Sequence, residues 1–271
     1  MKDFFKYHIS VTTCFMKLAI QRQLEYPAFL ICWAIGIPIQ YLSGVWMIGV
    51  ITQRFQPLNG WSFPQVAFIY GLSLLSHGLM VVLFIQTWNI EGMVIRGGFD
   101  RLLLRPMNVF YQFCVQYFNF IGLIDLITGI IIFTYGCKVS GFNWTLMNAV
   151  KILLVLAGAV MIRAAFYTIT GSIAFWTKSS RSFVNLGEVL SERTTMYPLS
   201  IYPYAIQVFF TFVIPFGFIS FYPASEFLGQ SDLLVLPFGF ALLTPVVGAL
   251  LAIVAAKVFK MGLKKYESAG S

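Results

Sequence analysis

Two ionisable residues, Asp125 and Arg163, lie inside long apolar stretches of the chain, where a charge is costly to bury. They stand at similar distances from Gly136 and Lys151, which mark the facing ends of two consecutive apolar stretches. Antiparallel helices that rise about 1.5 Å per residue would place the two side chains at a similar depth. We predict that they form an ion pair that locks the two helices together, and a role in transport is the alternative.

Uncharged polar residues at helical spacing form a second set of candidates. Gln112, Gln116 and Asn119 fall on one stripe of a helix, and Arg163 and Tyr167 are spaced in the same way. Such stripes serve hydrogen bonding between helices as readily as contact with a substrate. A lone buried histidine satisfied by a neighbour is likewise the simpler interpretation of His77. The candidates for a translocation path are His77, Gln112, Gln116, Asn119 and Tyr167.

Six long apolar stretches, separated by short polar segments, must position these residues. We expect membrane-spanning helices over 27–52, 64–87, 107–136, 148–176, 204–222 and 233–256. Each stretch holds about 20 residues or more, enough for a helix to cross a hydrocarbon core about 30 Å thick. The chain is 59% hydrophobic and 10% charged over 271 residues, which leaves no segment for a separate soluble domain. The expected fold is a single all-α transmembrane domain over 1–271, a polytopic membrane protein.

Lysine and arginine orient this bundle. Most of the 18 basic residues lie before the first span, in the second and fourth loops, and in the C-terminal tail. The positive-inside rule places those segments and both termini in the cytoplasm. The net charge of +8 fits contact with anionic membrane lipid at the inner face and gives no argument for a nucleic acid partner.

The N-terminal segment, 1–26, is too polar to cross the membrane and too apolar to be a free tail. Apolar residues recur at helical spacing from Phe4 to Leu18. We therefore predict an amphipathic helix in the inner interface, with a weakly lipid-bound tail as the alternative.

Two cytoplasmic loops carry apolar residues among charges. In the segment 88–105, the pair Gly97-Gly98 interrupts a short helical face before apolar residues reappear. We predict a docking surface for a soluble partner, and a loop folded against lipid headgroups is the alternative. The loop 177–203 is expected to contain a second interfacial or docking helix, or a simple connector.

On the outer side, the aromatic segment 218–232 is too apolar for a solvated loop. It predicts a re-entrant element that caps the outer mouth, which is possible only where protein satisfies the backbone. A helix that simply ends at Pro223 is the alternative. The candidate residues of an outer gate are Phe221, Tyr222, Pro223 and Glu226.

Several chemistries lack their sequence signals. The chain has no GxxxxGK[ST] loop for ATP, no HExxH, no histidine cluster with metal spacing and no nucleophile elbow. Its four cysteines are widely spaced and form no CxxC pair. We expect a transport subunit that is not an enzyme and that binds no metal or cofactor of its own. A proton-coupled secondary transporter, with Asp125 or His77 as a relay, is the leading alternative, and an intramembrane enzyme is disfavoured.

Two stretches carry a resemblance to a known family. The sequence GFDRLLLRPMN at 98–108 resembles a signature of a bacterial branch of the type-two ATP-binding-cassette (ABC) exporter permeases, and IPFGFISFYPA at 214–224 resembles the end of the fifth span in that family. The resemblance implies a dimer of like or unlike permeases on two separate ATPase subunits, which hold ATP and Mg²⁺, in a bacterial inner membrane. Substrates of the family include drugs, antibiotics, peptides, lipids and polysaccharides, so the substrate stays open.

The resemblance also implies a coupling helix between the second and third spans, here within 88–105. The residues that it assigns to coupling with the ATPase are Glu91, Arg96, Phe99, Asp100, Arg101, Leu102, Leu103 and Arg105. The expected function is therefore that of the membrane subunit of an ATP-driven exporter.

Overall fold

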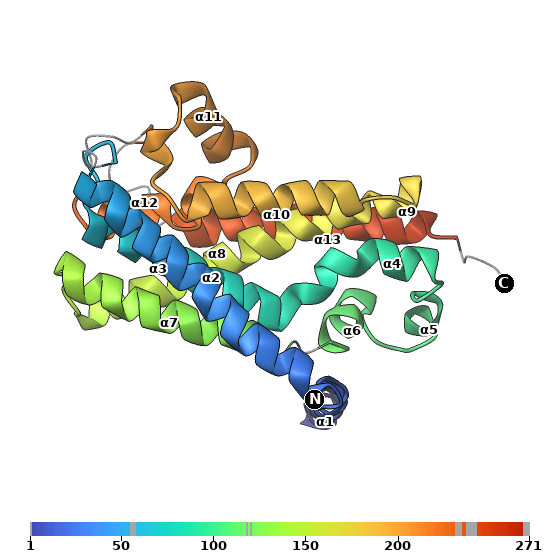
Figure 1. Ribbon diagram of the computed structural model, residues 1–271. Helices are drawn as coiled ribbons and strands as arrows, with labels where there is room; N and C mark the ends of the chain where they lie inside the picture. The colour runs from blue at the N-terminus through green and yellow to red at the C-terminus, as the bar shows by residue number, and fades with distance from the viewer. Residues whose placement is uncertain are drawn as a thin grey trace.

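The computed structural model describes residues 2–54, 58–117, 119, 121–230, 235–236 and 243–267, although the side chains of 2–11, 22, 53 and 54 lie outside this description. Within these ranges the chain is a bundle of helices without a β-strand (Figure 1). Five helices are long and apolar enough to cross a membrane. They are α2 (Pro27–Arg54), α3 (Phe63–Phe84), α7 (Ile121–Ser140), α8 (Leu146–Ser172) and α13 (Thr244–Lys265). The chain is therefore an all-α, multi-pass membrane protein.

Close helix packing depends on residues without side chains. A Cβ atom at Gly71 of α3 would lie 2.5 Å from the Phe133 backbone of α7, and one at Gly248 of α13 would lie 2.5 Å from the carbonyl oxygen of Gly158 in α8. Small residues let helix backbones approach closely in a membrane, where packing rather than the hydrophobic effect holds helices together. Two tight pairs, α3 with α7 and α8 with α13, form the framework of the bundle.

The third predicted span, 107–136, is wrong as a single helix. The chain forms α6 (Val109–Val115) and then α7 from Ile121. The side chain of Asn108 accepts a hydrogen bond from the Tyr111 backbone N–H, and that of Asn119 accepts one from Ile121. These asparagines satisfy amide groups at the start of each helix, so the sequence favours two helices over one.

The segment 177–203 is not the cytoplasmic loop that we predicted. It contains α10 (Arg181–Thr195), which runs alongside α8 (Figure 1). At the basic, inner end of the bundle, the backbone N–H groups of Ser180 and Arg181 donate to Glu91. At the opposite end, the side-chain amide of Asn59, in the loop between α2 and α3, donates to the Ser200 carbonyl at 2.8 Å. Residues 180–200 therefore cross the bundle and add a sixth crossing.

The apolar segment 204–222, predicted as the fifth span, does not cross. It forms α11 (Tyr204–Val208), a π-helical turn over Phe209–Val213, a 3₁₀ turn over Phe216–Phe218 and α12 (Phe221–Phe227). The two arms, Tyr204–Val213 and Phe216–Phe227, are bent by 81°. The segment follows the outer end of the α10 crossing and precedes α13, which begins at Thr244 and runs inward. It is therefore a re-entrant element that enters and leaves on the outer side.

The sixth predicted span, 233–256, begins later than we expected. Helix α13 starts at Thr244, and most of the earlier part of that prediction lies outside the described residues. The end of the predicted outer cap, at 231–232, lies outside them as well.

The N-terminal helix α1 (Lys2–Leu24) lies across the bundle axis, and Figure 1 shows it end-on beside the start of α2. It contacts the inner elements through Thr12, whose hydroxyl lies 2.7 Å from that of Tyr111, and through Phe15, whose ring lies 5.8 Å from the guanidinium of Arg105. This orientation is that expected of a helix in the inner interface.

The crossing by α10 predicts a labelling pattern. In a background without cysteines, Ile201→Cys should react with a membrane-impermeant thiol reagent from outside, whereas Ser179→Cys should react only after the membrane is opened. Both residues are exposed, so access to the reagent depends on the side of the membrane rather than on burial. If neither position reacted with the outside reagent, residues 177–203 would form a cytoplasmic loop, as the sequence predicted.

Candidate functional site

The inner end of the bundle carries the segment predicted to dock a soluble partner. A 3₁₀ turn (Ile85–Asn89), α4 (Ile90–Ile95) and α5 (Asp100–Leu103) follow α3 without a long break. Gly97, between α4 and α5, has a φ of +65°, a conformation that favours glycine. The reversal at this residue folds α5 back against the bundle.

Phe99 and Leu102 are buried, so the prediction that they form the docking contact is wrong. The Phe99 ring is 0% exposed and lies within 6 Å, centroid to centroid, of Phe113, Phe175 and Phe259. These rings come from α6, α9 (Ala174–Thr177) and α13. An aromatic core therefore joins the coupling segment to three other elements and gives it a fixed position.

The apolar residues that remain available for docking lie beside this core. Leu103 is 48% exposed and Leu104 is 86% exposed, and the neighbouring Arg101 and Arg105 are exposed as well. An exposed pair of leucines rimmed by arginines is typical of the centre and edge of a protein interface.

Polar contacts hold the coupling segment from inside the chain. The Gln112 amide donates to the carbonyl oxygens of Leu102 and Met107, at 3.2 and 2.9 Å. The Gln112 side chain therefore stabilises the fold of this segment. The Tyr266 hydroxyl donates to Asp100 at 2.9 Å. Burial, and then this hydrogen bond, raise the pKa of Tyr266 to about 12. Arg96 donates to the backbone of its own helix turn.

Glu91 connects the coupling segment to α10. Its carboxylate accepts hydrogen bonds from the backbone N–H groups of Ser180 and Arg181. The first amides of a helix have no partner within the helix, and its dipole favours a negative charge there. Glu91 therefore joins α4 to the first turn of the helix that crosses the bundle.

Arg163 lies at the centre of the bundle in a cage of hydroxyl groups. Its guanidinium donates to Ser73 and Ser76 of α3 and to Ser191 and Thr195 of α10, and to the Ser73 carbonyl. The predicted ion pair with Asp125 is wrong, because the Asp125 carboxylate lies instead 4.0 Å from His77 Nε2. Arg163, on α8, thus joins three helices through neutral partners.

The remaining path candidates do not lie together. Tyr167 is buried against the rings of Trp88 and Phe166, and Asn119 caps α7. Gln116 lines a small cleft beside α1. The predicted stripe of Gln112, Gln116 and Asn119 is interrupted by the break between α6 and α7, which separates their roles.

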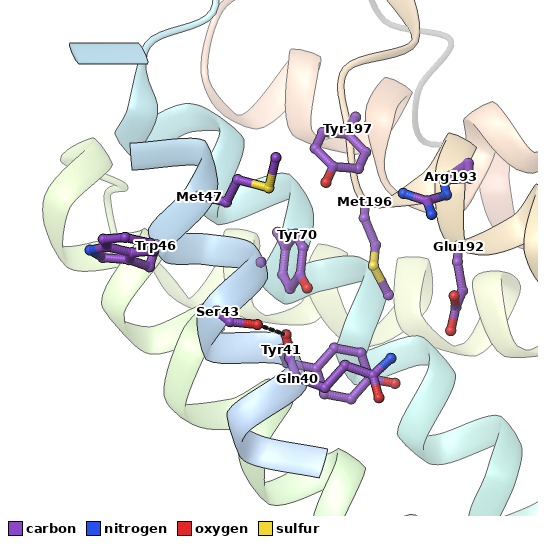
Figure 2. Close-up of a pocket in the computed structure, with 11 residues that line it drawn as sticks. Gln40, Tyr41, Ser43, Trp46, Met47, Tyr70, Glu192, Arg193, Met196 and Tyr197 are labelled. Atoms are coloured by element: carbon purple, nitrogen blue, oxygen red, sulfur yellow. Dashed lines mark hydrogen bonds between the residues drawn. The ribbon is translucent and has the colours of Figure 1, made fainter. Parts of the chain in front are cut away.

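A larger cleft of about 410 Å³ lies where the outer half of α2 faces α3 and the end of α10. Figure 2 shows Tyr41 and Tyr70 at its base, with Glu192 and Arg193 on the opposite wall. The rings of Tyr41 and Tyr70 meet edge to face, with centroids 6.5 Å apart. The sequence did not predict this cleft, because residues 177–203 were expected in the cytoplasm.

The outer candidates gather in the second arm of the re-entrant element. Phe221, Tyr222 and Pro223 are buried, as a cap over the outer mouth requires. The Tyr222 hydroxyl lies 2.6 Å from that of Thr211 in the first arm, and Glu226 lies 3.5 Å from the Lys151 ammonium of α8. These contacts hold the two arms together and tie the second to the bundle.

Comparison with known proteins adds one match. Residues 39–270 match the family described as ABC-2 family transporter protein. The chain belongs to the ABC-2 transporter family. It is a permease subunit, the membrane component that works with ATP-binding-cassette components in this family. No curated protein and no solved structure matches the chain. The family match spans the segment 88–105, α10 and α12 of this permease.

Proposed function

We propose that this permease is the transmembrane subunit of an ATP-driven exporter of lipophilic or amphipathic compounds in a bacterial inner membrane. Two copies, or one copy and a related chain, would assemble on two separate ATPase subunits, which hold ATP and Mg²⁺. The observation that carries the proposal is the set of exposed polar side chains on α10, a helix that crosses the bundle.

Helix α10 exposes polar and apolar residues together. Val184, Gly187 and Ser191 face the bundle and are buried. The exposed side carries the polar residues Arg181, Asn185 and Arg193 beside the apolar residues Phe183, Leu186 and Val189. Charged side chains that face lipid within a bilayer are costly and rare. This face therefore fits the border of a water-filled path, closed on its far side by a second permease chain.

The inner end of the permease offers a route by which ATP could drive this path. Closure of the ATPase subunits would push on Leu103 and Leu104, and the aromatic core around Phe99 would carry the motion to α13. Glu91 would carry it to the start of α10. Such a displacement would switch the path between inward and outward access.

Transport in vesicles tests this proposal. The permease reconstituted with its ATPase subunits should export a substrate in a manner that requires ATP and is inhibited by vanadate. Transport that persists without ATP and collapses with a protonophore would instead support a proton-coupled secondary transporter. The contact between His77 and Asp125, within the bundle at 4.0 Å, is the observation that favours that alternative.

The Glu91 contact predicts that a variant can lose transport activity and still bind the ATPase subunits. Glu91→Ala should weaken the attachment of α10 by about 1 kcal/mol, or about fivefold. Transport should fall by a similar factor while the ATPase subunits still co-purify. Glu25→Ala, which removes an exposed acid at the same side of the membrane, is the matched control. Equal transport by the two variants would show that Glu91 does not help to couple the ATPase subunits to transport.

A further inference from the structure

The cleft between α2, α3 and α10 combines a carboxylate with several aromatic rings. Of its lining residues, Met47, Tyr70, Met196 and Glu192 are shown in Figure 2 around one open space. Its volume of about 410 Å³ falls in the range of about 300–1,000 Å³ that is usual for sites of drug-sized ligands. The cleft is therefore large enough for a small organic molecule.

Glu192 is the charged group best placed to select a ligand. It is half-buried, and it forms no hydrogen bond or ion pair within the part of the chain that the structure describes. Figure 2 shows its carboxylate pointing away from Arg193, toward the side of the cleft where Gln40 and Tyr41 lie. A carboxylate that has left bulk water without a partner gains most from a cation.

The aromatic walls favour the same sign of charge. The faces of Tyr41 and Tyr70 carry negative electrostatic potential, which attracts cations and above all poorly hydrated organic cations. Met47 and Met196 complete the walls with flexible, polarisable side chains that adapt to different shapes.

Two basic residues also lie near the cleft. Arg163 keeps its charge, because its partners are neutral hydroxyl and carbonyl groups, but it does not line the space. Arg193 lines it and is exposed, and water screens an exposed charge more than a half-buried one. Glu192 is therefore the less screened of the two charges that line the cleft.

We infer that this cleft binds amphipathic organic monocations, with Glu192 as the counter-ion and the rings of Tyr41 and Tyr70 as the walls. The inference rests on the proposed export function and narrows its substrates from lipophilic compounds in general to those with a single positive charge.

A pair of ions of the same shape and opposite charge tests this inference. Tetraphenylphosphonium and tetraphenylborate are added to the purified permease in detergent, and binding is measured by equilibrium dialysis against protein-free micelles. The phosphonium should bind saturably and at least about tenfold more tightly to the protein than the borate does. Glu192→Gln should weaken phosphonium binding by about tenfold and leave borate binding unchanged.

Three control variants complete the experiment. Glu188→Gln removes an acid on the same helix that does not line the cleft, and it should leave phosphonium binding unchanged. Tyr41→Phe should retain binding and Tyr41→Leu should weaken it, because only the former keeps an aromatic face. Unchanged thermal unfolding of Glu192→Gln shows that the variant is folded.

Either of two results would overturn the inference. Equal binding of the two ions, or full phosphonium affinity in Glu192→Gln, would show that the cleft does not select cations. Equally weak phosphonium binding in Glu192→Gln and Arg193→Gln would also contradict the inference, because loss of a positive charge should not weaken the binding of a cation. Because binding is measured without ATPase subunits, its outcome is independent of whether ATP drives transport.

Discussion

Replacing Arg163 with alanine is expected to destabilise the permease by about 3 kcal/mol or more. The guanidinium is buried and donates to Ser73 and Ser76 on one side and to Ser191 and Thr195 on the other. Its removal leaves a cavity between three helices. It also leaves these four hydroxyl groups without the cation that donates hydrogen bonds to them. Thermal unfolding of the purified permease in detergent measures the loss.

Double-mutant cycles identify the partners of Arg163. Arg163→Ala combined with Ser191→Ala should cost less than the sum of the two single changes, because both remove the same contact. Arg163→Ala combined with Asp125→Asn should be additive, because Asp125 lies beside His77 instead. Strong coupling between Arg163 and Asp125 would restore the ion pair that the sequence suggested and contradict the hydroxyl cage.

Arg163→Lys separates the shape of the side chain from its charge. A lysine keeps the positive charge, but its compact ammonium lacks the planar fork with which arginine reaches two helices at once. We expect it to recover only part of the stability that alanine loses. Full recovery would mean that the charge alone, rather than the link between α3 and α10, supports the bundle.

The sequence predicts the class of fold and most of the crossings because a long apolar run is a strong local signal. Helices α2, α3, α8 and α13 each overlap a predicted span. Helix α10 was not predicted as a span because it is short and mixes charged with apolar residues, whereas the re-entrant segment at 204–227 is apolar enough to resemble a span. Apolar length reports burial from water, and it does not distinguish a crossing from a hairpin packed against the bundle.

The candidate site was harder to predict because its partners are distant in the sequence. The cost of burying a charge identified Arg163 as important, but its real partners include Ser191 and Thr195, which lay in a segment assigned to the cytoplasm. Phe99 stood among charges and was expected at the surface. Its neighbours Phe175 and Phe259 come from elements far along the chain, and no local pattern indicates that contact.

Replacing Leu104 with glutamate is expected to release the ATPase subunits. Leu104 is 86% exposed at the inner end of the bundle, next to the exposed Leu103, so a partner that docks there must cover it. A carboxylate placed in that apolar contact should cost about 2 kcal/mol or more of association free energy, or about thirtyfold in affinity. Co-purification of the cognate ATPase with the tagged permease measures the effect.

Leu146→Glu provides the matched control for this prediction, because Leu146 is 85% exposed but lies at the outer start of α8. It should leave the association with the ATPase unchanged. Phe99→Asp should behave differently from both, because its ring belongs to the buried aromatic core and a charge there should lower thermal stability and yield. Since Leu104 makes no contribution to that core, its glutamate variant should unfold at the same temperature as the unaltered permease. A Leu104→Glu permease that still co-purifies in full with its ATPase would exclude the α5 surface as the docking site.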